Sequence, residues 1–290
     1  MKRVYIICFI LFVCSSNYAA NILNVRSFFS IQFKNNEFPS DVIFIDGNVY
    51  ILESKSGKLI KIDMKKKEIV KKYNLIDSEG SIGVTFYKEK LFVPIPNKNK
   101  INVYSFKNLK KLKEIYVIDP TDIEFYRDKG FVVSNDKHKL IILDAKTLKR
   151  IGDFGNMGYY EREFRYPFDL EIDKNGDLYI SEVINTRVQI LDNKLRFVNF
   201  VGKWGVKSGT FYRPKGIDIY NDYLIVADGY IGVIQFFNKK NGDIVYLLGV
   251  DGKLYKFLSP VRVRVFKDFL GIVDYYQKKV LIFKLGDISR

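Results

Sequence analysis

Eight charged residues stand at matching places in a unit that recurs six times along the chain. They lie two or four residues after the first residue of the unit, and side-chain alternation along a β-strand places both positions on one face of that strand. The eight are Asp41, Asp122, Glu124, Asp169, Glu171, Asp218, Arg262 and Arg264. Carboxylates and guanidinium groups that share a narrow space must be hydrated or paired. These positions are therefore the first candidates for chemistry.

Two arrangements of these charges are open. In one, Arg262 and Arg264 pair with Asp41 and Asp218, and the remaining acids cap turns and bind water. Those remaining acids form an acidic arc of Asp122, Glu124, Asp169 and Glu171. In the other, the arc holds a hard cation, because clustered oxygen ligands suit Ca²⁺, with Asp122 and Asp169 as the candidate metal ligands. Without a cation or an arginine among them, like charges raise some of the carboxyl pKa values. No other cofactor is expected.

The recurring unit itself predicts the fold. It begins at Pro39, Ser81, Pro120, Pro167, Pro214 and Pro260. The unit from Pro167 contains four short apolar runs, at 168–172, 178–181, 187–191 and 197–201, which are separated by turn residues. A period of this length with several strands in each unit is typical of a β-propeller. The sequence therefore predicts an all-β, six-bladed β-propeller with four-stranded antiparallel blades, whose innermost strands line a central channel. The apolar residues between the charged positions should pack between blades.

The last unit is short of one strand. After Pro260 there are three strand-like runs, at 261–266, 269–274 and 280–285, and an unassigned run lies at 23–33. We expect this N-terminal strand to complete the last blade, which closes the ring without a frayed edge. Residues 21–290 are then one domain.

Two stretches that precede inner strands resemble the opening of an NHL repeat. They are GNMGYYEREFRYP at 155–167 and GKWGVKSGTFYRPKGI at 202–217. The segment LYISEVINTRVQI at 178–190 is similar to the rest of that repeat, and the similarity is clearest over 150–250. The resemblance implies an exported bacterial propeller in which polar residues such as Asn185 and Arg187 tie neighbouring blades together. Ile231 and Val233 replace that pattern in the next blade.

The first twenty residues differ from the repeats. Lys2 and Arg3 precede an apolar run at 4–13, which is followed by small residues up to Ala20. This pattern is typical of a secretory signal peptide, and the apolar run is too short to span a bilayer. Both cysteines, Cys8 and Cys14, lie in this leader. A lipid anchor at Cys14 is disfavoured because no small residue precedes it. We expect an extracytoplasmic protein, periplasmic or secreted, with no transmembrane segment after signal removal.

The chain is basic, with a formal net charge of +15. A positive balance of this size attracts anionic partners. For an exported protein these are acidic proteins or an anionic envelope polymer, and no nucleic acid is expected.

Loops from the fourth strand of one blade to the first strand of the next, and from second to third strands, emerge on one face of a propeller. Seven residues of these loops form the predicted binding face: Arg162, Arg165, Tyr166, Trp204, Tyr212, Arg213 and Tyr230. Aromatic and arginine side chains are the usual anchors of interfaces. Phe164 and Phe211 should instead fill the space between blades, and His138 and Arg187 should lie in these loops, with His138 solvated.

Two functions of different class follow. The first is a non-catalytic binding scaffold that presents the binding face to a protein or an envelope polymer. The alternative rests on related six-bladed propellers that are metal-dependent lactonases or lyases, here with a Ca²⁺-type site at the channel mouth. The chain has a single histidine, His138, and no nucleophile or cofactor motif, so no catalytic residue is assigned.

Overall fold

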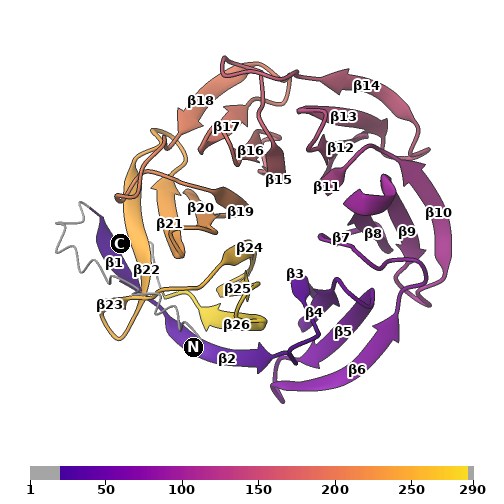
Figure 1. Ribbon diagram of the computed structural model, residues 1–290, viewed down its shortest axis with the longest axis horizontal. Helices are drawn as coiled ribbons and strands as arrows, with labels where there is room; N and C mark the ends of the chain where they lie inside the picture. Colours follow the sequence, from indigo (N-terminus) through magenta and orange to yellow (C-terminus); the bar gives the residue numbers. More distant parts are fainter. Residues whose placement is uncertain (1–19, 287–290) are drawn as a thin grey trace, which may run out of the picture.

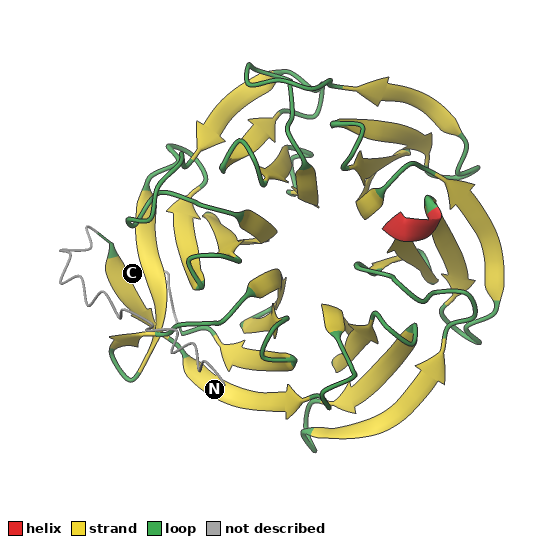
Figure 2. Ribbon diagram, in the orientation of Figure 1, coloured by secondary structure: helices red, strands yellow, loops and turns green. Residues whose placement is uncertain are grey.

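The computed structural model describes residues 20–286 as six β-sheets arranged around a central axis (Figures 1 and 2). Apart from one short 3₁₀ turn, Pro96–Lys98, all regular structure in this range is β. Each sheet contains four antiparallel strands, which follow sequential order except in the sheet of blade 6, whose outer strand comes from the N-terminal part of the chain, and the sheet of blade 5 has two more strands. The predicted six-bladed propeller is confirmed. No helix among these residues has the length and apolar character needed to cross a membrane.

The strands follow the repeat from the axis outward. Blades 1 to 3 contain β3 (Pro39–Ile45), β4 (Asn48–Glu53), β5 (Lys58–Asp63), β6 (Glu68–Asn74); β7 (Thr85–Tyr87), β8 (Lys90–Ile95), β9 (Lys100–Ser105), β10 (Lys111–Tyr116); and β11 (Pro120–Tyr126), β12 (Lys129–Ser134), β13 (Lys139–Asp144), β14 (Arg150–Phe154). Blades 4 to 6 contain β15 (Pro167–Ile172), β16 (Leu178–Glu182), β17 (Arg187–Leu191), β18 (Phe197–Val201); β19 (Pro214–Tyr220), β20 (Tyr223–Asp228), β21 (Val233–Asn238), β22 (Ile244–Val250); and β24 (Pro260–Phe266), β25 (Phe269–Asp274), β26 (Lys279–Lys284).

Five inner strands begin at the proline that opens the unit. Proline suits the first position of a strand because it has no N–H to contribute to the ladder. Blade 2 differs, since β7 begins at Thr85 and not at Ser81. The neighbouring strand carries Pro94, and only its carbonyl bonds back, to the amide of Ile82 at 3.2 Å. The missing amide of Pro94 shortens the ladder and hence the inner strand.

Both ends of the described chain meet in blade 6. Strand β2 (Arg26–Gln32) pairs antiparallel with β26, which supplies the fourth strand of that blade. The predicted single strand at 23–33 is in fact two, because β1 (Asn21–Asn24) pairs parallel with β22 on the edge of blade 5. Buried Val25 separates them, and its amide bonds to the carbonyl of Gly249 at 2.9 Å. The short β23 (Lys253–Leu254) also joins β22. The N-terminal segment thus fastens two blades.

The core lies between blades and not at the axis. Six clusters of buried apolar side chains fill the six junctions between neighbouring blades. Inner-strand residues Val42, Ile123, Leu170, Ile217 and Val263 are fully buried in these clusters, as the alternation predicts. The charged residues of the same strands must therefore point to the axis.

The register of the closing strand gives the first prediction. Arg26 lies opposite Lys284, so a short hairpin turn could join β26 directly to β2. A chain that lacks residues 21–33 should lose its cooperative unfolding transition because blade 6 then keeps an unpaired edge. A permuted chain that begins at Lys34 and carries 26–33 after a short turn beyond Lys284 should regain it. Thermal unfolding followed by circular dichroism measures both, and an unchanged transition in the deleted chain would contradict the closure.

Candidate functional site

The eight charged inner-strand residues form two layers along the axis. The first layer contains Asp41, Asp122, Asp169 and Arg262, and all four are fully buried. The second layer contains Glu124, Glu171, Asp218 and Arg264, one pleat further along the inner strands. It faces a cavity of about 250 Å³ on the side where the first strand of each blade turns into the second.

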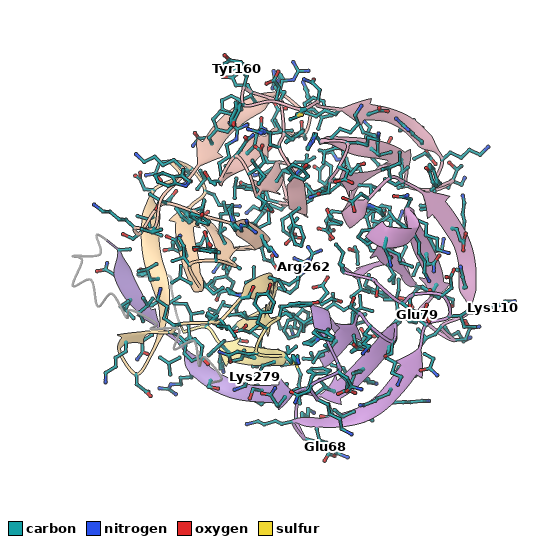
Figure 3. All side chains as sticks on the ribbon, viewed as in Figure 1. Glu68, Glu79, Lys110, Tyr160, Arg262 and Lys279 are labelled. Carbon is teal, nitrogen blue, oxygen red and sulfur yellow. The ribbon has the colours of Figure 1, made fainter. Side chains whose placement is uncertain are left out.

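Arg262 occupies the axis of the first layer, as Figure 3 shows. Its guanidinium forms an ion pair and hydrogen bond with Asp169, and it lies 3.8 Å from a carboxylate oxygen of Asp122 and 4.0 Å from one of Asp41. It also donates to the carbonyl of Thr121 at 2.8 Å. One cation thus faces acids from blades 1, 3 and 4, and its burial closes this layer to solvent.

Blades 2 and 5 leave room for this side chain by carrying glycine at the same place. A Cβ on Gly216 would lie 2.5 Å from the Cα of Arg262, and one on Gly83 would lie 3.1 Å from its Nη2. The two glycines therefore belong to the arginine site.

The predicted pairing is confirmed for Asp41, which lies 3.6 Å from Arg264 and 4.0 Å from Arg262, and is wrong for Asp218. Arg264 also lies 3.1 Å from Asp169 and 3.5 Å from Glu171, so both arginines contact the acidic arc as well. Among residues 20–286, no ion pair joins Asp218 to an arginine. The reason is reach: an arginine side chain crosses the axis to the opposite blades and is not confined to those beside it.

The aspartates have a second role that the sequence reasoning missed. Each accepts a hydrogen bond from a backbone amide of the following blade. Asp41 bonds to the amide of Val84 (3.0 Å), Asp122 to Leu170 (3.0 Å), Asp169 to Ile217 (2.8 Å) and Asp218 to Val265 (2.5 Å). These bonds join inner strands at four of the six junctions. Their recurrence at corresponding positions was the signal available in the sequence.

Asp122 and Asp169, the candidate calcium ligands, are committed to these contacts. Each gives one oxygen to a backbone amide and lies against two guanidinium groups. Within residues 20–286, no group of three or more histidine, cysteine, aspartate or glutamate side chains is arranged to hold a metal ion. The geometry describes an ion-paired core, and the calcium prediction gains no support from it.

Asp169 is the exception among the axial carboxyls whose pKa is shifted, because in the same layer burial and repulsion from Asp169 raise the pKa of Asp122 well above its usual value. Burial opposes the ionisation of Asp169, but Arg262 and Arg264 outweigh it and lower its pKa to about 2. In the second layer burial dominates, and the single Arg264 does not compensate three carboxyls. Burial raises the pKa of Glu124 to about 8 and that of Asp218 to about 7. Burial and repulsion from Asp218 and Glu124 raise the pKa of Glu171 well above its usual value. The second layer therefore binds protons near neutral pH.

The predicted binding face lies at the opposite ends of the inner strands. Trp204 is 71% exposed and Tyr230 is 63% exposed, and the ring of Tyr230 stacks on Tyr212 at 4.1 Å. Arg162, Arg213 and Tyr166 are exposed, and Arg165 is half-buried with its guanidinium 4.5 Å from the ring of Tyr159. The structure groups Arg162, Arg165 and Tyr166 before β15, and Trp204, Tyr212, Arg213 and Tyr230 around blade 5. No hydrogen bond, ion pair or ring contact connects the two groups within the part of the chain that is described.

Buried acids at the ends of second strands hold these loops from below. Asp228 accepts bonds from the backbone amides of Tyr212 (2.6 Å), Arg213 (3.1 Å) and Tyr230 (3.0 Å). Glu182 accepts one from the amide of Arg165 at 3.1 Å. The acids that do this in four blades are Glu53, Glu182, Asp228 and Asp274. They fix the backbone of the binding face, and their recurrence was also visible in the sequence.

Two residues assigned to the loops of this face are not free. Arg187 is buried, ion-paired with Glu182 at 2.7 Å and placed 3.7 Å from the ring centre of Phe200. His138 is 9% exposed and not solvated, because its Nδ1 accepts the amide hydrogen of Tyr166 at 3.1 Å. Burial lowers its pKa. Phe164 and Phe211 are fully buried, as expected.

Comparison with known proteins supports the fold. A catalytically inactive variant of virginiamycin B lyase from Staphylococcus aureus, solved with quinupristin, is 14% identical with a TM-score of 0.64 and covers 89% of this chain and 99% of its own. A streptogramin B lyase is 13% identical with a TM-score of 0.65 and covers 90% and 98%. The WD40 propeller domain of Doa1 is 11% identical with a TM-score of 0.64 and covers 92% and 98%. At these identities the similarity establishes the fold alone.

No protein-family model matches the chain, and no curated protein matches its sequence. The likeness to NHL repeats therefore rests on the residues quoted for it.

The buried arginine of the first layer gives the second prediction. Arg262→Gln should lower the free energy of unfolding by about 3–5 kcal/mol, because it leaves buried carboxylates without their cation. Denaturant unfolding measures the change. Arg196→Gln is the matched control, since Arg196 pairs with Asp192 on the surface, where solvent screens the pair, and its loss should change stability far less. Equal effects of the two substitutions would contradict the assigned role.

The second layer gives the third prediction. Glu124 and Asp218 keep protons in the folded protein at pH values where the unfolded chain, with pKa values near 4.5 and 3.8, has lost them. Their stabilising contribution is therefore complete below about pH 4 and is lost as the pH rises through about 7 and 8. Stability should fall from about pH 4.5 to about pH 8, by at most about 1.4 kcal/mol per pH unit for each proton, and level off above that.

Glu124→Gln should flatten this fall, because the amide keeps the shape of the side chain and does not ionise. Melting temperatures across the pH series measure it, with exposed Glu68→Gln as the control. The same slope in Glu124→Gln as in the unchanged protein would contradict the assignment.

Proposed function

We propose that the protein is a non-catalytic, extracytoplasmic binding scaffold of the NHL type, which presents the binding face to a protein or an anionic envelope polymer. The observation that carries this proposal is the set of exposed aromatic and arginine side chains on loops whose backbone is held by buried Asp228 and Glu182. A surface that is ordered before binding loses less conformational entropy when a partner docks.

The composition of this face suits a partner surface. Trp204 and the stacked pair of Tyr212 and Tyr230 offer large rigid rings, and Arg213 stands beside them. Tryptophan, tyrosine and arginine are the residues that most often dominate binding energy at interfaces. Arginine at the face of a chain with a net charge of +15 favours an anionic partner.

Export and NHL character are parts of the same proposal. The predicted signal peptide, 1–20, falls almost wholly outside the described residues. The two NHL-like loops share one geometry, because Met157 bridges Phe164 and Trp204 bridges Phe211 in the same parallel manner. This shared geometry supports a true repeat.

The alternative is a metal-dependent lactonase-like or lyase-like enzyme that acts at the channel mouth. The two lyases with the same fold favour it, as does the group of carboxyls in the second layer. Against it, the only histidine of the chain, His138, is buried against the amide of Tyr166. Metal ligation by Asp122 and Asp169 would have to displace two arginines. The scaffold is therefore the better-supported function.

A pull-down from the native envelope fraction gives the fourth prediction. The tagged protein should retain a partner, and the double substitution Trp204→Ala with Tyr212→Ala should lose most of it, because truncated interface aromatics commonly cost more than about 2 kcal/mol each. Tyr116→Ala is the control, since Tyr116 is 75% exposed on the outer strand of blade 2.

If the double variant retained every partner, the assignment of this face as the binding surface would be wrong. The enzyme alternative can be tested separately with the same purified protein. It requires a melting temperature that rises with Ca²⁺ and falls with EDTA, whereas the scaffold requires neither.

A further inference from the structure

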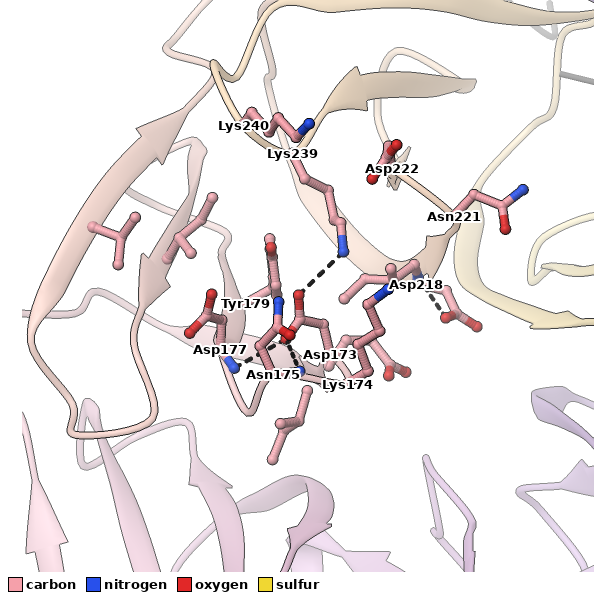
Figure 4. A pocket seen from close by; sticks show the side chains of 15 residues that line it. Asp173, Lys174, Asn175, Asp177, Tyr179, Asp218, Asn221, Asp222, Lys239 and Lys240 are labelled. Carbon is pink, nitrogen blue, oxygen red and sulfur yellow. Dashed lines mark hydrogen bonds and ion pairs between the residues drawn. The ribbon is translucent and has the colours of Figure 1, made fainter. Parts of the chain in front are cut away.

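A groove of about 800 Å³ lies between blades 4 and 5, on the face opposite the binding face. Turn residues 173–177 and 221–222 and the turn at 239–240 form its rim, as the close view in Figure 4 shows. Its inner end reaches Glu171 and Asp218 of the second layer, and its outer end reaches Val198 on β18. It crosses the four strands of blade 4, so its length is about 14 Å, given about 4.8 Å between neighbouring strands.

The middle of the groove is a fixed polar wall. The ammonium of Lys239 lies 3.1 Å from Asp173, and the side chains of both residues are largely buried. The other oxygen of Asp173 accepts the backbone amides of Asn175 (2.9 Å) and Asp177 (3.1 Å). Lys239 and Asp173 therefore neutralise each other. The net charge of the groove depends on its other ionisable residues.

Tyr179 is the unexplained residue of this wall. It lines the groove and is only 3% exposed, yet its hydroxyl makes no hydrogen bond within residues 20–286. Its ring contacts the ammonium of Lys239, which lies 5.9 Å from the ring centre. The hydroxyl oxygen is not one of the fully enclosed polar atoms, so it opens to the groove and is free to bond to a ligand atom there.

The remaining ionisable groups of the groove are mainly carboxyls. Apart from the Lys239–Asp173 pair, four carboxyls line it against two ammonium groups: Glu171, Asp177, Asp218 and Asp222 against Lys174 and Lys240. This local excess of acid stands in a chain with a net charge of +15. At the inner end, three carboxyls including Glu124 share the single Arg264. Burial, with repulsion from Asp173 and Asp192, raises the pKa of Asp177 as well, and the ammonium of Lys239 offsets this only in part.

We propose that this groove binds a linear cationic amine, with one ammonium group beside Glu171 and Asp218 and another beside Asp177 and the hydroxyl of Tyr179. The ammonium groups supply the positive charge that the wall lacks and the donor that Tyr179 lacks. The site is independent of the binding face, because the buried first layer of the channel separates the two ends of the axis.

Proton release on binding distinguishes a specific site at Glu171 and Asp218 from nonspecific attraction of a cation to the protein surface. An ammonium group beside Glu171 and Asp218 favours their ionised forms, so binding should release protons near pH 7. Affinity should therefore rise between pH 6 and pH 8, the range in which the folded protein otherwise loses these protons.

Titration calorimetry of the purified protein with spermidine is the fifth prediction. We expect one site, with a heat that depends on the ionisation enthalpy of the buffer in the direction of proton release. Glu171→Gln should weaken binding by about tenfold or more and reduce the number of protons released, leaving only the share of Asp218. Tyr179→Phe should also weaken binding while leaving the melting temperature unchanged or higher, because the lost hydroxyl had no partner in the protein.

Two controls keep the proposal falsifiable. Lys240→Gln removes a positive charge from the rim and should tighten binding, whereas Asp251→Asn, on an exposed turn after β22, should not change it. Absence of spermidine binding, equal affinity in Glu171→Gln, or several weak sites that vanish at physiological salt would overturn the proposal. So would binding of a neutral oligosaccharide of the same length in place of spermidine. None of these outcomes touches the binding face, whose test uses Trp204 and Tyr212.

Discussion

The charge balance on the axis is the constraint on which the ring depends. Asp41, Asp122 and Asp169 of the first layer accept amide hydrogens from the next blade while fully buried, and a guanidinium lies among them. Burying a carboxylate without a cation costs several kcal/mol, which is more than the hydrogen bond to the amide returns. The bonds between blades and the ion pairs of Arg262 are therefore one cooperative unit, and neither is stable in this environment without the other.

Ring closure and charge neutralisation are coupled through blade 6. Its inner strand β24 carries both axial arginines, and its outer strand β2 comes from the N-terminal part of the chain. The acids on blades 1, 3 and 4 thus receive their cation only when the last blade is in place. The parallel pairing of β1 with β22 adds a second fastening across the same junction. Blade 6, which is built from both ends of the described chain, thus completes the ring of hydrogen-bonded strands and supplies both arginines of the axial ion pairs.

Local patterns were sufficient for the fold but not for the contacts across the axis. The strands predicted at 187–191 and 197–201 match β17 and β18, because apolar alternation and turn residues are properties of adjacent positions. The inward direction of the charged residues followed from the same alternation. The partners of Arg262 and Arg264 did not, since they depend on side-chain reach across the ring. The groove beside Tyr179 was equally invisible, because Asp173 and Lys239 meet only when blades 4 and 5 pack side by side.

The two faces of the propeller carry opposite chemistry, and the axial layer explains how both can exist in one small domain. One face has exposed rings and arginines, and the other has a groove with an excess of carboxyls. Arg262 and its acids are fully buried between the two faces. The axis is therefore closed to solvent at this layer, and the two faces are separate surfaces. Three aspartates link the two layers, since Asp41, Asp122 and Asp169 each contact Arg262 of the first layer and Arg264 of the second. Because Asp169 has a pKa of about 2, its own ion pairs with Arg262 and Arg264 persist when the second layer takes up protons. A ligand that changes the charge of the groove therefore acts on one face without loosening the other.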